Sequence, residues 1–314
     1  MAEFQRYDTV VVGGGPAALA AAIYAGRAEL KVVVLERMAL GGQVALTHAI
    51  DNYPGFPEGI SGPELTALMA AQARRFGAEI STEEVTRIEL DGDIKIVTTT
   101  ERVCRAPTLI LAMGADPKKL DVPGEKELRG RGVSYCGTCD APFFRDKKVV
   151  VVGGGDSALK EGLFIAKFAR ETVIVHRRQE FRAEKIYQTE ARRHPKISFL
   201  LEMVVEKING QEKVQGVDVR NVKSGERSHV PCDGVFIFIG TVPNTHFLSN
   251  IFPSDAGGHV KTDLDMMTSV PGFFAVGDVR ENSYRQIATA VGEGATAAIA
   301  AEHWLAARKA RLNG

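Results

Sequence analysis

Two clusters of three glycines, at 13–15 and 153–155, constrain the fold of this 314-residue chain more than any other feature. The first cluster follows the apolar run 8–12 and precedes an alanine-rich stretch from Pro16 to about Arg27. Another apolar run then begins at Lys31 and ends on Glu36. Short β-branched runs on either side of a helical stretch are typical of a strand–turn–helix–strand unit, and such units build parallel sheets.

The same order of elements returns in the middle of the chain. Four valines, 149–152, lead into the second cluster, which is followed by a predicted helix from about Asp156 to Ala169 and a predicted strand from Thr172 to Val175. The apolar run 109–114 is likewise echoed by 236–240, and both runs end in glycine. The repeats predict an α/β fold with two Rossmann-like, three-layer ββα nucleotide-binding domains.

Proline follows each of the echoed runs, at Pro117 and Pro243, where the chain is expected to pass from one domain to the other. At roughly 150 residues per domain, the length also suits two domains. We therefore expect residues 1–117 and 246–314 to form one discontinuous domain, with residues 118–245 inserted into it as the second.

Both clusters fit the dinucleotide-binding fingerprint, in which two glycines and a third small residue are spaced Gly-x-Gly-x-x-Ala. The glycines allow a tight turn and a close approach of the backbone to a pyrophosphate at the helix N-terminus. One match is weak evidence, because glycine-rich turns before helices are common. Two matches in complete strand–loop–helix–strand contexts predict two nucleotide sites. The matching residues are Gly13, Gly15 and Ala18, and Gly153, Gly155 and Ala158.

The residue that ends the second strand of each unit distinguishes the two sites. In the first unit it is Glu36, whose carboxylate can accept hydrogen bonds from two ribose hydroxyls but would repel a 2′-phosphate. In the second unit it is His176, followed by three arginines suited to a 2′-phosphate: Arg177, Arg178 and Arg182. We expect FAD or NAD in the first site and NADP in the second, and hence hydride transfer from a nicotinamide to a flavin. The alternative for the basic cluster is an ordinary solvated surface.

A Cys-x-x-Cys pair, Cys136-Gly137-Thr138-Cys139, precedes the second glycine cluster. Half a zinc site is one interpretation, but zinc takes four ligands and the sequence has no second such pair. We therefore favour a redox dithiol and expect no metal. Asp140, directly after the pair, fits proton transfer during thiol–disulfide exchange and helix capping equally well. Cys104 and Cys232 lie beside apolar runs and are expected in the core.

Composition excludes several classes of partner. Lys plus Arg and Asp plus Glu each number 39, so the chain lacks the net positive charge that nucleic acids and anionic membranes attract. No apolar stretch approaches the ~18–20 residues of a membrane span, and the N-terminal residues run straight into a strand with no room for a signal peptide. With only four cysteines, these features predict a cytoplasmic protein in which any disulfide is catalytic.

Taken in order, the motifs of this chain resemble those of the low-molecular-weight, bacterial-type thioredoxin reductases. The resemblance covers nearly the whole chain, and a cysteine pair beside the nicotinamide fingerprint separates this family from the larger glutathione-reductase group. The motifs that carry it are Gly13-Gly14-Gly15-Pro16-Ala17, Gly41-Gly42-Gln43, Asn52-Tyr53-Pro54-Gly55, the cysteine pair with Asp140, Gly153 to Ala158, His176-Arg177-Arg178 with Arg182, Gly277-Asp278 and Arg285-Gln286.

The resemblance implies a homodimeric thioredoxin-disulfide reductase with FAD and NADPH as cofactors and oxidised thioredoxin as its protein substrate. Cys139 would face the flavin, Cys136 would attack the thioredoxin disulfide, and Asp140 would be the acid–base group. The FAD-binding residues that it implies are Gly13, Gly15, Pro16, Ala17, Glu36, Arg37, Gly41, Gly42, Gln43, Asn52, Ala112, Gly114, Gly277, Asp278, Arg285, Gln286 and Ile287. For NADP they are Gly153, Gly155, Asp156, Ser157, His176, Arg177, Arg178, Arg182 and Gly240.

Two other functions stay open from the sequence: a reductase or oxidase of another dithiol partner on the same scaffold, and a flavin-based redox sensor without turnover. Three residues depart from the family pattern, near the flavin (Met113), near the NADP site (Thr241) and beside the surface for the protein partner (Pro142). Phe143 is retained as a candidate for docking thioredoxin, together with the phenylalanine that follows it. His48, in a loop on the flavin side, is expected to be an ordinary polar residue.

Overall fold

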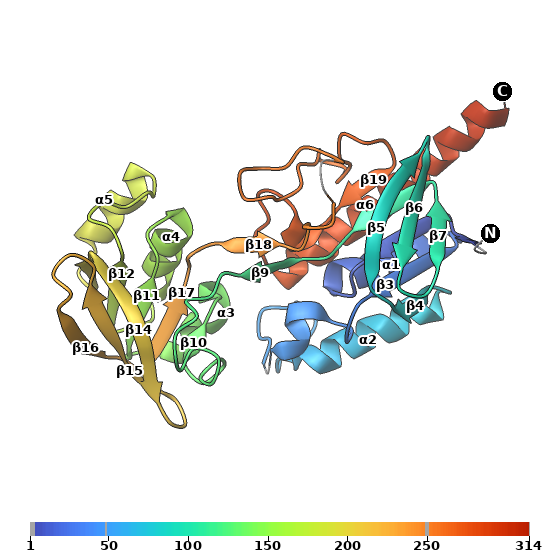
Figure 1. Ribbon diagram of the computed structural model, residues 1–314. Coiled ribbons are helices and arrows are strands. Elements are labelled where there is room, and N and C mark those ends of the chain that lie inside the picture. Colours follow the sequence, from blue (N-terminus) through green and yellow to red (C-terminus); the bar gives the residue numbers. More distant parts are fainter. Residues whose placement is uncertain (1–3, 48, 249–250, 314) are drawn as a thin grey trace. The chain divides into compact units, whose positions relative to one another are not determined.

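The computed structural model describes residues 4–47, 49–248 and 251–313, so His48 lies outside the described residues. The chain divides into two compact units (Figure 1): Met1–Asp116 with Val242–Gly314 make up unit 1, and Pro117–Thr241 make up unit 2. The passages between units were expected at 117–118 and 245–246, and the structure places them at 116–117 and 241–242. The crossing strands, β9 (Ala115–Pro117) and β18 (Thr241–Pro243), pair with each other.

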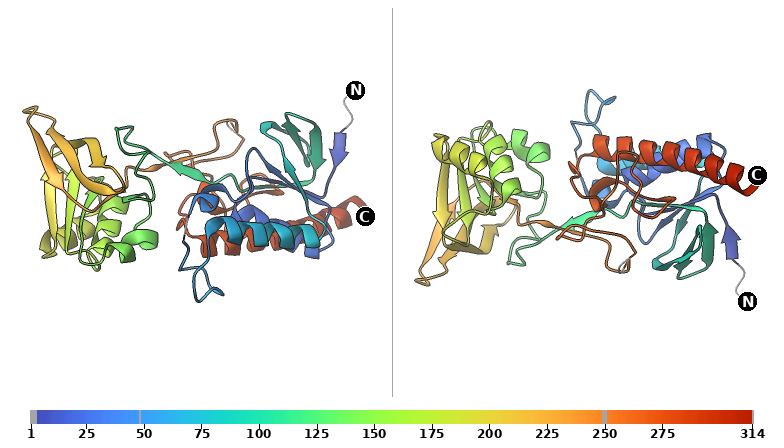
Figure 2. Two further views of the ribbon diagram at one scale, coloured as in Figure 1. Left: turned by 90° about the horizontal axis from the view of Figure 1, so that it is seen from below. Right: turned by 90° about the horizontal axis from the view of Figure 1, so that it is seen from above.

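Unit 1 has three layers around a parallel sheet of order β19-β8-β2-β3-β4. The strands of this sheet are β2 (Thr9–Val12), β3 (Val32–Glu36), β4 (Glu79–Thr82), β8 (Thr108–Leu111) and β19 (Phe273–Ala275). One face carries three helices, α1 (Pro16–Arg27), α2 (Gly62–Arg75) and α6 (Ile287–Asn313). The other face carries a second sheet (Figure 2), made of β1 (Phe4–Arg6), β7 (Val103–Ala106), β6 (Ile94–Thr99) and β5 (Val85–Asp91) in that order.

The alternation of side chains along β2 explains the layering of unit 1. Val11 packs among the alanines of α1 and α6, whereas Val10 and Val12 pack against the second sheet. Because both faces of the central sheet are covered, its inner strands β2 and β8 are buried along their whole length, whereas the edge strand β4 carries polar, partly exposed residues. Small residues let the helices approach closely, since a Cβ at Gly294 of α6 would lie 2.2 Å from the carbonyl oxygen of Ala17 in α1. The alanine-rich sequence after the first glycine turn is therefore a packing surface.

Unit 2 repeats this plan around a parallel sheet of order β10-β17-β11-β12-β13. Its strands are β10 (Val133–Ser134), β11 (Lys148–Val152), β12 (Glu171–His176), β13 (Ile197–Leu201) and β17 (Gly234–Ile237). An antiparallel sheet packs on one face and consists of β14 (Met203–Gly210), β15 (Val214–Asn221) and β16 (Arg227–Pro231). Helical segments pack on the other, namely α3 (Gly137–Asp140), η2 (Ala141–Phe144), α4 (Asp156–Ile165) and α5 (Lys185–Arg193).

The two parallel sheets confirm the predicted α/β fold, with differences at the helix ends. The helix after the second glycine cluster ends at Ile165, earlier than the expected Ala169, and the chain continues in a turn. The C-terminal helix α6 runs from Ile287 to Asn313. Among the described residues, no helix has the length and apolar character needed to cross a bilayer.

Lys95, which the sequence did not single out, joins three separate segments of unit 1. Its side chain is only 1% exposed, and its ammonium group donates hydrogen bonds to the carbonyl oxygens of Asp93, Pro107 and Pro271 at 3.1, 2.9 and 2.6 Å. The ring of Trp304 in α6 lies 4.9 Å from the same nitrogen. A buried ammonium group is tolerated when its three donors are matched, so Lys95 ties the second sheet to the C-terminal helix.

Candidate active site

The first glycine turn joins β2 to α1 and leaves the start of that helix open. Gly13 has a φ of +109°, and a Cβ there would lie 2.4 Å from the carbonyl oxygen of Ala112, so only glycine fits. Gly15 caps α1 without a side-chain hydrogen bond, and a Cβ on it would meet nothing within 4 Å. Pro16 is the first residue of the helix. The free backbone N–H groups at this end therefore face open space, which suits a phosphate-bearing ligand.

Glu36 is held against this turn by the backbone. Its Oε2 accepts a hydrogen bond from the N–H of Gly14 at 2.6 Å, and its Oε1 accepts one from the N–H of Met38 at 3.0 Å. A carboxylate offers about four lone pairs, so each oxygen retains capacity to accept a ribose hydroxyl. The next predicted residue, Arg37, is exposed.

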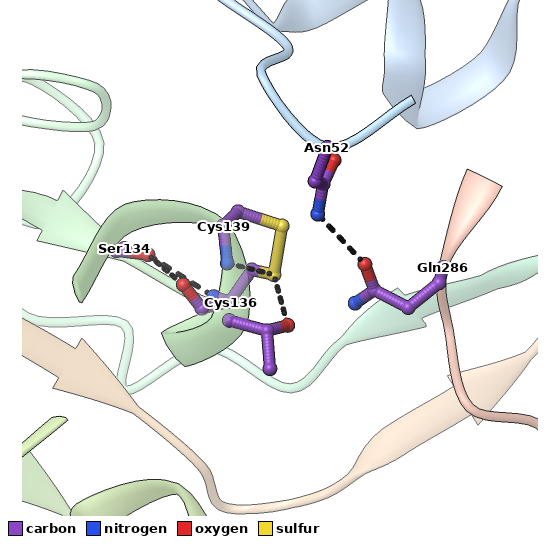
Figure 3. The surroundings of a disulfide bond; sticks show 6 residues. Asn52, Ser134, Cys136, Cys139 and Gln286 are labelled. Atoms are coloured by element: carbon purple, nitrogen blue, oxygen red, sulfur yellow. Dashed lines mark hydrogen bonds between the residues drawn. A yellow bond between two sulfur atoms is a disulfide. The ribbon is translucent and has the colours of Figure 1, made fainter. Parts of the chain in front are cut away.

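Hydrogen bonds join segments of unit 1 that are far apart in the sequence. The N–H of Gly41 donates to the carbonyl oxygen of Gly14 at 2.8 Å, and η1 (Gly42–Leu46) follows. Asn52 donates its side-chain amide to the Oε1 of Gln286 at 3.1 Å, a pair visible in Figure 3. Gln43, Gly114 and Ile287 also lie in unit 1: Gln43 donates to Asp116, Gly114 follows β8, and Ile287 begins α6. The contacts thus join four of the predicted flavin-side motifs in two pairs.

Asp278 lies in η3 (Gly277–Val279), a short turn that precedes α6. Burial raises the pKa of its carboxyl group, while Arg285 and a hydrogen bond from Ser283 act in the opposite direction. The turn is fastened by Glu293, which sequence reasoning missed. Its Oε2 accepts a hydrogen bond from the N–H of Gly277 at 2.6 Å, and its Oε1 pairs with Arg280 at 2.7 Å.

The second glycine turn has the same pattern of close contacts as the first. Gly153 has a φ of +151°, and a Cβ there would lie 2.3 Å from the carbonyl oxygen of Phe238. Its N–H donates to the carbonyl oxygen of Val175 at 3.0 Å, as Gly13 donates to Leu35 at 2.8 Å. Gly155 caps α4 without a side-chain hydrogen bond and, like Gly15, faces open space. Unit 2 therefore has a helix N-terminus of the same build.

The side chain behind the second turn is different. The ring of His176 is buried beneath Gly154, where a Cβ would lie 2.2 Å from it, and it stacks on Phe181 at 5.3 Å. Burial lowers its pKa, and the neighbouring arginines lower it further, so the imidazole is neutral at pH 7. His176 therefore shapes the turn from behind.

The three arginines next to His176 are exposed, and in the described part of the chain none of them forms an ion pair: Arg177, Arg178 and Arg182. The N–H of Arg182 also donates to the carbonyl oxygen of Gly154 at 2.8 Å, which anchors the cluster to the turn. Ser157 is exposed near the start of α4, and Gly240 precedes β18. Asp156 has a role that the sequence did not indicate, because its Oδ1 accepts a hydrogen bond from the N–H of Glu184 at 2.7 Å.

The cysteine pair forms a disulfide at the start of α3 (Figure 3). The Sγ of Cys136 accepts a hydrogen bond from the N–H of Cys139 at 3.2 Å. The hydroxyl of Ser134 accepts one from the N–H of Cys136 at 3.0 Å. Burial raises the pKa of the Asp140 carboxyl group, which Ser134 partly opposes. A proton-binding group whose pKa is moved towards neutrality beside a disulfide is equipped for thiol chemistry.

The three departures from the family pattern have clear structural positions. The carbonyl oxygen of Met113 accepts a hydrogen bond from the side-chain amide of Asn244 at 3.0 Å. Thr241 begins the crossing strand β18. Pro142 lies in the first turn of η2, and the adjacent Phe143 is 52% exposed. Cys104 and Cys232 are both buried free thiols, as expected.

Comparison with known proteins decides the family. A family model described as pyridine nucleotide-disulphide oxidoreductase matches residues 7–294. The thioredoxin reductase of Mycolicibacterium smegmatis is 46% identical over 301 residues, which cover 96% of this chain and 97% of the relative. The chain belongs to the low-molecular-weight thioredoxin reductases. The resemblance inferred from the motifs is thereby confirmed.

Further members of the thioredoxin reductase family show the same similarity. The thioredoxin reductase of Bacillus subtilis is 44% identical over 307 residues, which cover 97% of this chain and 96% of that protein. The crystal structure of thioredoxin reductase from Streptococcus pyogenes gives a TM-score of 0.90 at 44% identity, covering 96% of this chain and 99% of that one. The match to the family extends through both units.

Proposed function

We propose that this chain uses NADPH and FAD to reduce the disulfide of thioredoxin. One observation carries the proposal: two glycine turns of the same build are backed by a carboxylate in unit 1 and flanked by arginines in unit 2, and unit 2 also holds the Cys136–Cys139 disulfide. FAD, when bound, accepts a hydride from NADPH and passes two electrons to a disulfide. The family to which the chain belongs supports this order of electron flow.

The residues of unit 1 fit FAD. The open N-terminus of α1 suits the pyrophosphate, and Glu36 is fixed where it can accept hydrogen bonds from the adenosine ribose. The remaining residues that we assign to this cofactor are Gly13, Gly15, Pro16, Ala17, Arg37, Gly41, Gly42, Gln43, Asn52, Ala112, Gly114, Gly277, Asp278, Arg285, Gln286 and Ile287.

The residues of unit 2 fit NADPH. The arginines have no carboxylate to neutralise them within the described residues, so they are available to a 2′-phosphate. Each charge-assisted hydrogen bond to that phosphate would contribute about 1.5–3 kcal/mol. The residues assigned here are Gly153, Gly155, Asp156, Ser157, His176, Arg177, Arg178, Arg182 and Gly240, of which His176 acts from behind the turn.

Reduction of thioredoxin then proceeds by thiol–disulfide exchange. The thiolate of Cys136 attacks one sulfur of the thioredoxin disulfide and forms a mixed disulfide, and Cys139 then attacks Cys136 to restore the intramolecular bond. Two electrons pass to thioredoxin, and the two protons lost by the cysteines balance those taken up by its thiols. The N–H of Cys139 favours the thiolate of Cys136, and Asp140 is placed to hold a proton. The dithiol must match or undercut the potential of thioredoxin, about −270 mV.

The purified protein, checked for a flavin spectrum, should be mixed with oxidised thioredoxin while oxidation of NADPH and then NADH is followed. Rapid oxidation that needs both NADPH and thioredoxin is the expected result. If NADPH bleaches the flavin but thioredoxin has no effect, another dithiol partner is the substrate. If NADPH does not bleach the flavin, the assignment of the arginine cluster is wrong. Sedimentation of the same sample tests the homodimer that the resemblance implies.

A further inference from the structure

Glu161 on α4 lies directly against the loop that carries the redox disulfide. A Cβ on Gly137, the first of the two residues between the cysteines, would lie 2.1 Å from the Oε2 of Glu161 and 3.2 Å from its Cδ. Gly137 and this oxygen are both buried. The carboxylate therefore occupies the space that a Cβ at position 137 would need, and a side chain there would push the end of Glu161 aside.

The carboxylate of Glu161 lies on the helix that begins at the second glycine turn. Helix α4 begins at the second glycine turn, and Glu161 lies on its side that packs against α3. At 1.5 Å per residue, the distance along the helix from Gly155 to Glu161 is roughly 9 Å. One helix thus presents its open N-terminus at the nucleotide turn and a carboxylate at the disulfide.

Two carboxyl groups lie on the elements that carry the disulfide and pack against it, Asp140 on α3 and Glu161 on α4. On α3 itself the titratable group is Asp140, whose pKa is raised by burial, so that its negative charge is disfavoured. From α4 comes Glu161, from β10 the neutral Ser134, and η2 contributes only alanine, proline and phenylalanine. Consecutive Cα atoms are 3.8 Å apart, so the carboxylate that touches Gly137 is close to Cys136.

We propose that Glu161 makes the Cys136–Cys139 couple more strongly reducing. Opening the disulfide takes up two electrons, and the sulfur atoms then carry negative charge or bind protons. A carboxylate nearby destabilises a thiolate and leaves the neutral disulfide unaffected, so it shifts the balance towards the oxidised form. Glu161 acts through the cysteines and is a positioning residue. The role of this effect rests on the proposed function, because a more strongly reducing dithiol shifts the equilibrium towards reduced thioredoxin.

The test is a redox titration of the full-length, flavin-loaded protein in dithiothreitol buffers, with the reduced fraction measured by alkylation. Glu161→Gln keeps the size of the side chain and removes the charge. We expect the equilibrium constant for reduction of the disulfide by dithiothreitol to rise by up to about tenfold in the variant. For two electrons this raises the reduction potential of the couple by about 30 mV. The rate of alkylation by iodoacetamide should also rise at lower pH in the variant, since the Cys136 thiolate is easier to form.

The other two cysteines do not disturb this measurement. Burial raises the pKa of Cys104 to about 11 and that of Cys232 to about 12, so neither is appreciably ionised near neutral pH. Glu190→Gln, at an exposed position on α5, is the matched control, because it removes the same charge from unit 2 away from the disulfide. An equal shift in both variants, or no shift in Glu161→Gln, would overturn the proposal.

A second variant keeps the test decisive if Glu161→Gln does not fold. Gly137→Ala puts a methyl group where the carboxylate lies, and should displace the charge and shift the equilibrium in the same direction. Adding Glu161→Gln to this variant should then give little further change; a full additional shift would contradict the argument. Neither NADPH nor thioredoxin enters the titration. A failure of the proposed function therefore leaves this result intact, and the reverse also holds.

Discussion

Glu36 and Gly14 are joined by a 2.6 Å hydrogen bond from the backbone N–H of the glycine to the carboxylate. At the equivalent place in unit 2, the ring of His176 packs directly beneath Gly154. The two turns have matching backbone contacts and differ in the residue that supports the middle glycine. A carboxylate at this place favours a ribose with free hydroxyls, and a neutral ring followed by arginines favours a phosphorylated one.

Gly15→Ala and Gly155→Ala should each weaken the binding of a different nucleotide. Because a Cβ at either position meets nothing within 4 Å, the free energy of unfolding should change by no more than about 1 kcal/mol. The methyl group would instead obstruct the pyrophosphate. Gly15→Ala should therefore lower the flavin content of the purified protein, whereas Gly155→Ala should keep the flavin and weaken NADPH binding by about tenfold or more. Absorbance spectra and NADPH titrations measure both effects.

Gly13→Ala is the contrasting variant for this pair. Its methyl group would lie 2.4 Å from a carbonyl oxygen and its φ is positive, so this variant should fold poorly. Normal flavin content in Gly15→Ala would show that the N-terminus of α1 does not bind FAD.

Replacing Arg177 and Arg178 together by alanine should raise the KM for NADPH by roughly 100-fold or more, since two charge-assisted hydrogen bonds are lost. The KM for NADH, which has no 2′-phosphate, should change little. Lys185→Ala combined with Arg193→Ala, two exposed changes on α5, serves as the control for net charge. Steady-state kinetics with both nucleotides checks the result, and an equal rise for NADH would refute the assignment.

Cys136→Ser should abolish turnover with thioredoxin, because the attacking sulfur is lost. Reduction of the flavin by NADPH should persist, since it does not require the disulfide. Stopped-flow absorbance separates the two steps, and Cys232→Ser, at a buried free thiol, is the matched control. Continued thioredoxin turnover in Cys136→Ser would disprove the role given to this residue.

Asp140→Asn should slow thioredoxin reduction by about 100-fold, the usual effect of losing a general acid–base group. It should also change the pH dependence of stability. Burial raises the pKa of Asp140 above its ordinary value of 3.8, so the folded protein keeps a proton that the unfolded chain releases. Stability is therefore lost as the pH rises from 3.8 through the folded pKa. The variant should gain more free energy of unfolding relative to the parent at pH 7 than at pH 4.

Urea unfolding at the two pH values measures this gain, with Asp146→Asn at an exposed position as the control. A gain that is the same at both pH values would show that Asp140 ionises in the folded protein as it does in the unfolded chain.

Local patterns made much of this molecule predictable. The glycine turns, the strand-ending Glu36 and the cysteine pair are each encoded within about 25 residues, and every one of them lies where the sequence indicates. The sequence also shows the repeat, and with it the layered fold of both units.

Contacts between distant segments could not be predicted in the same way. The position of His176 behind Gly154, the bond from Glu184 to Asp156 and the approach of Glu161 to Gly137 depend on how strands and helices pack. A single sequence carries no periodic signal for such contacts, because each involves one side chain and one stretch of backbone. The residues that tune the candidate sites therefore emerge only from the structure.

Lys95 contacts residues that are synthesised much later than itself. Its ammonium group reaches Pro271 and Trp304, which follow the whole of Pro117–Thr241 in the sequence. During synthesis from the N-terminus, unit 2 is complete before Lys95 has all of its partners. The inner unit is thus fully synthesised while the outer one still lacks its last strand and helix, and a nascent chain halted near residue 260 would leave Lys95 without the carbonyl oxygen of Pro271.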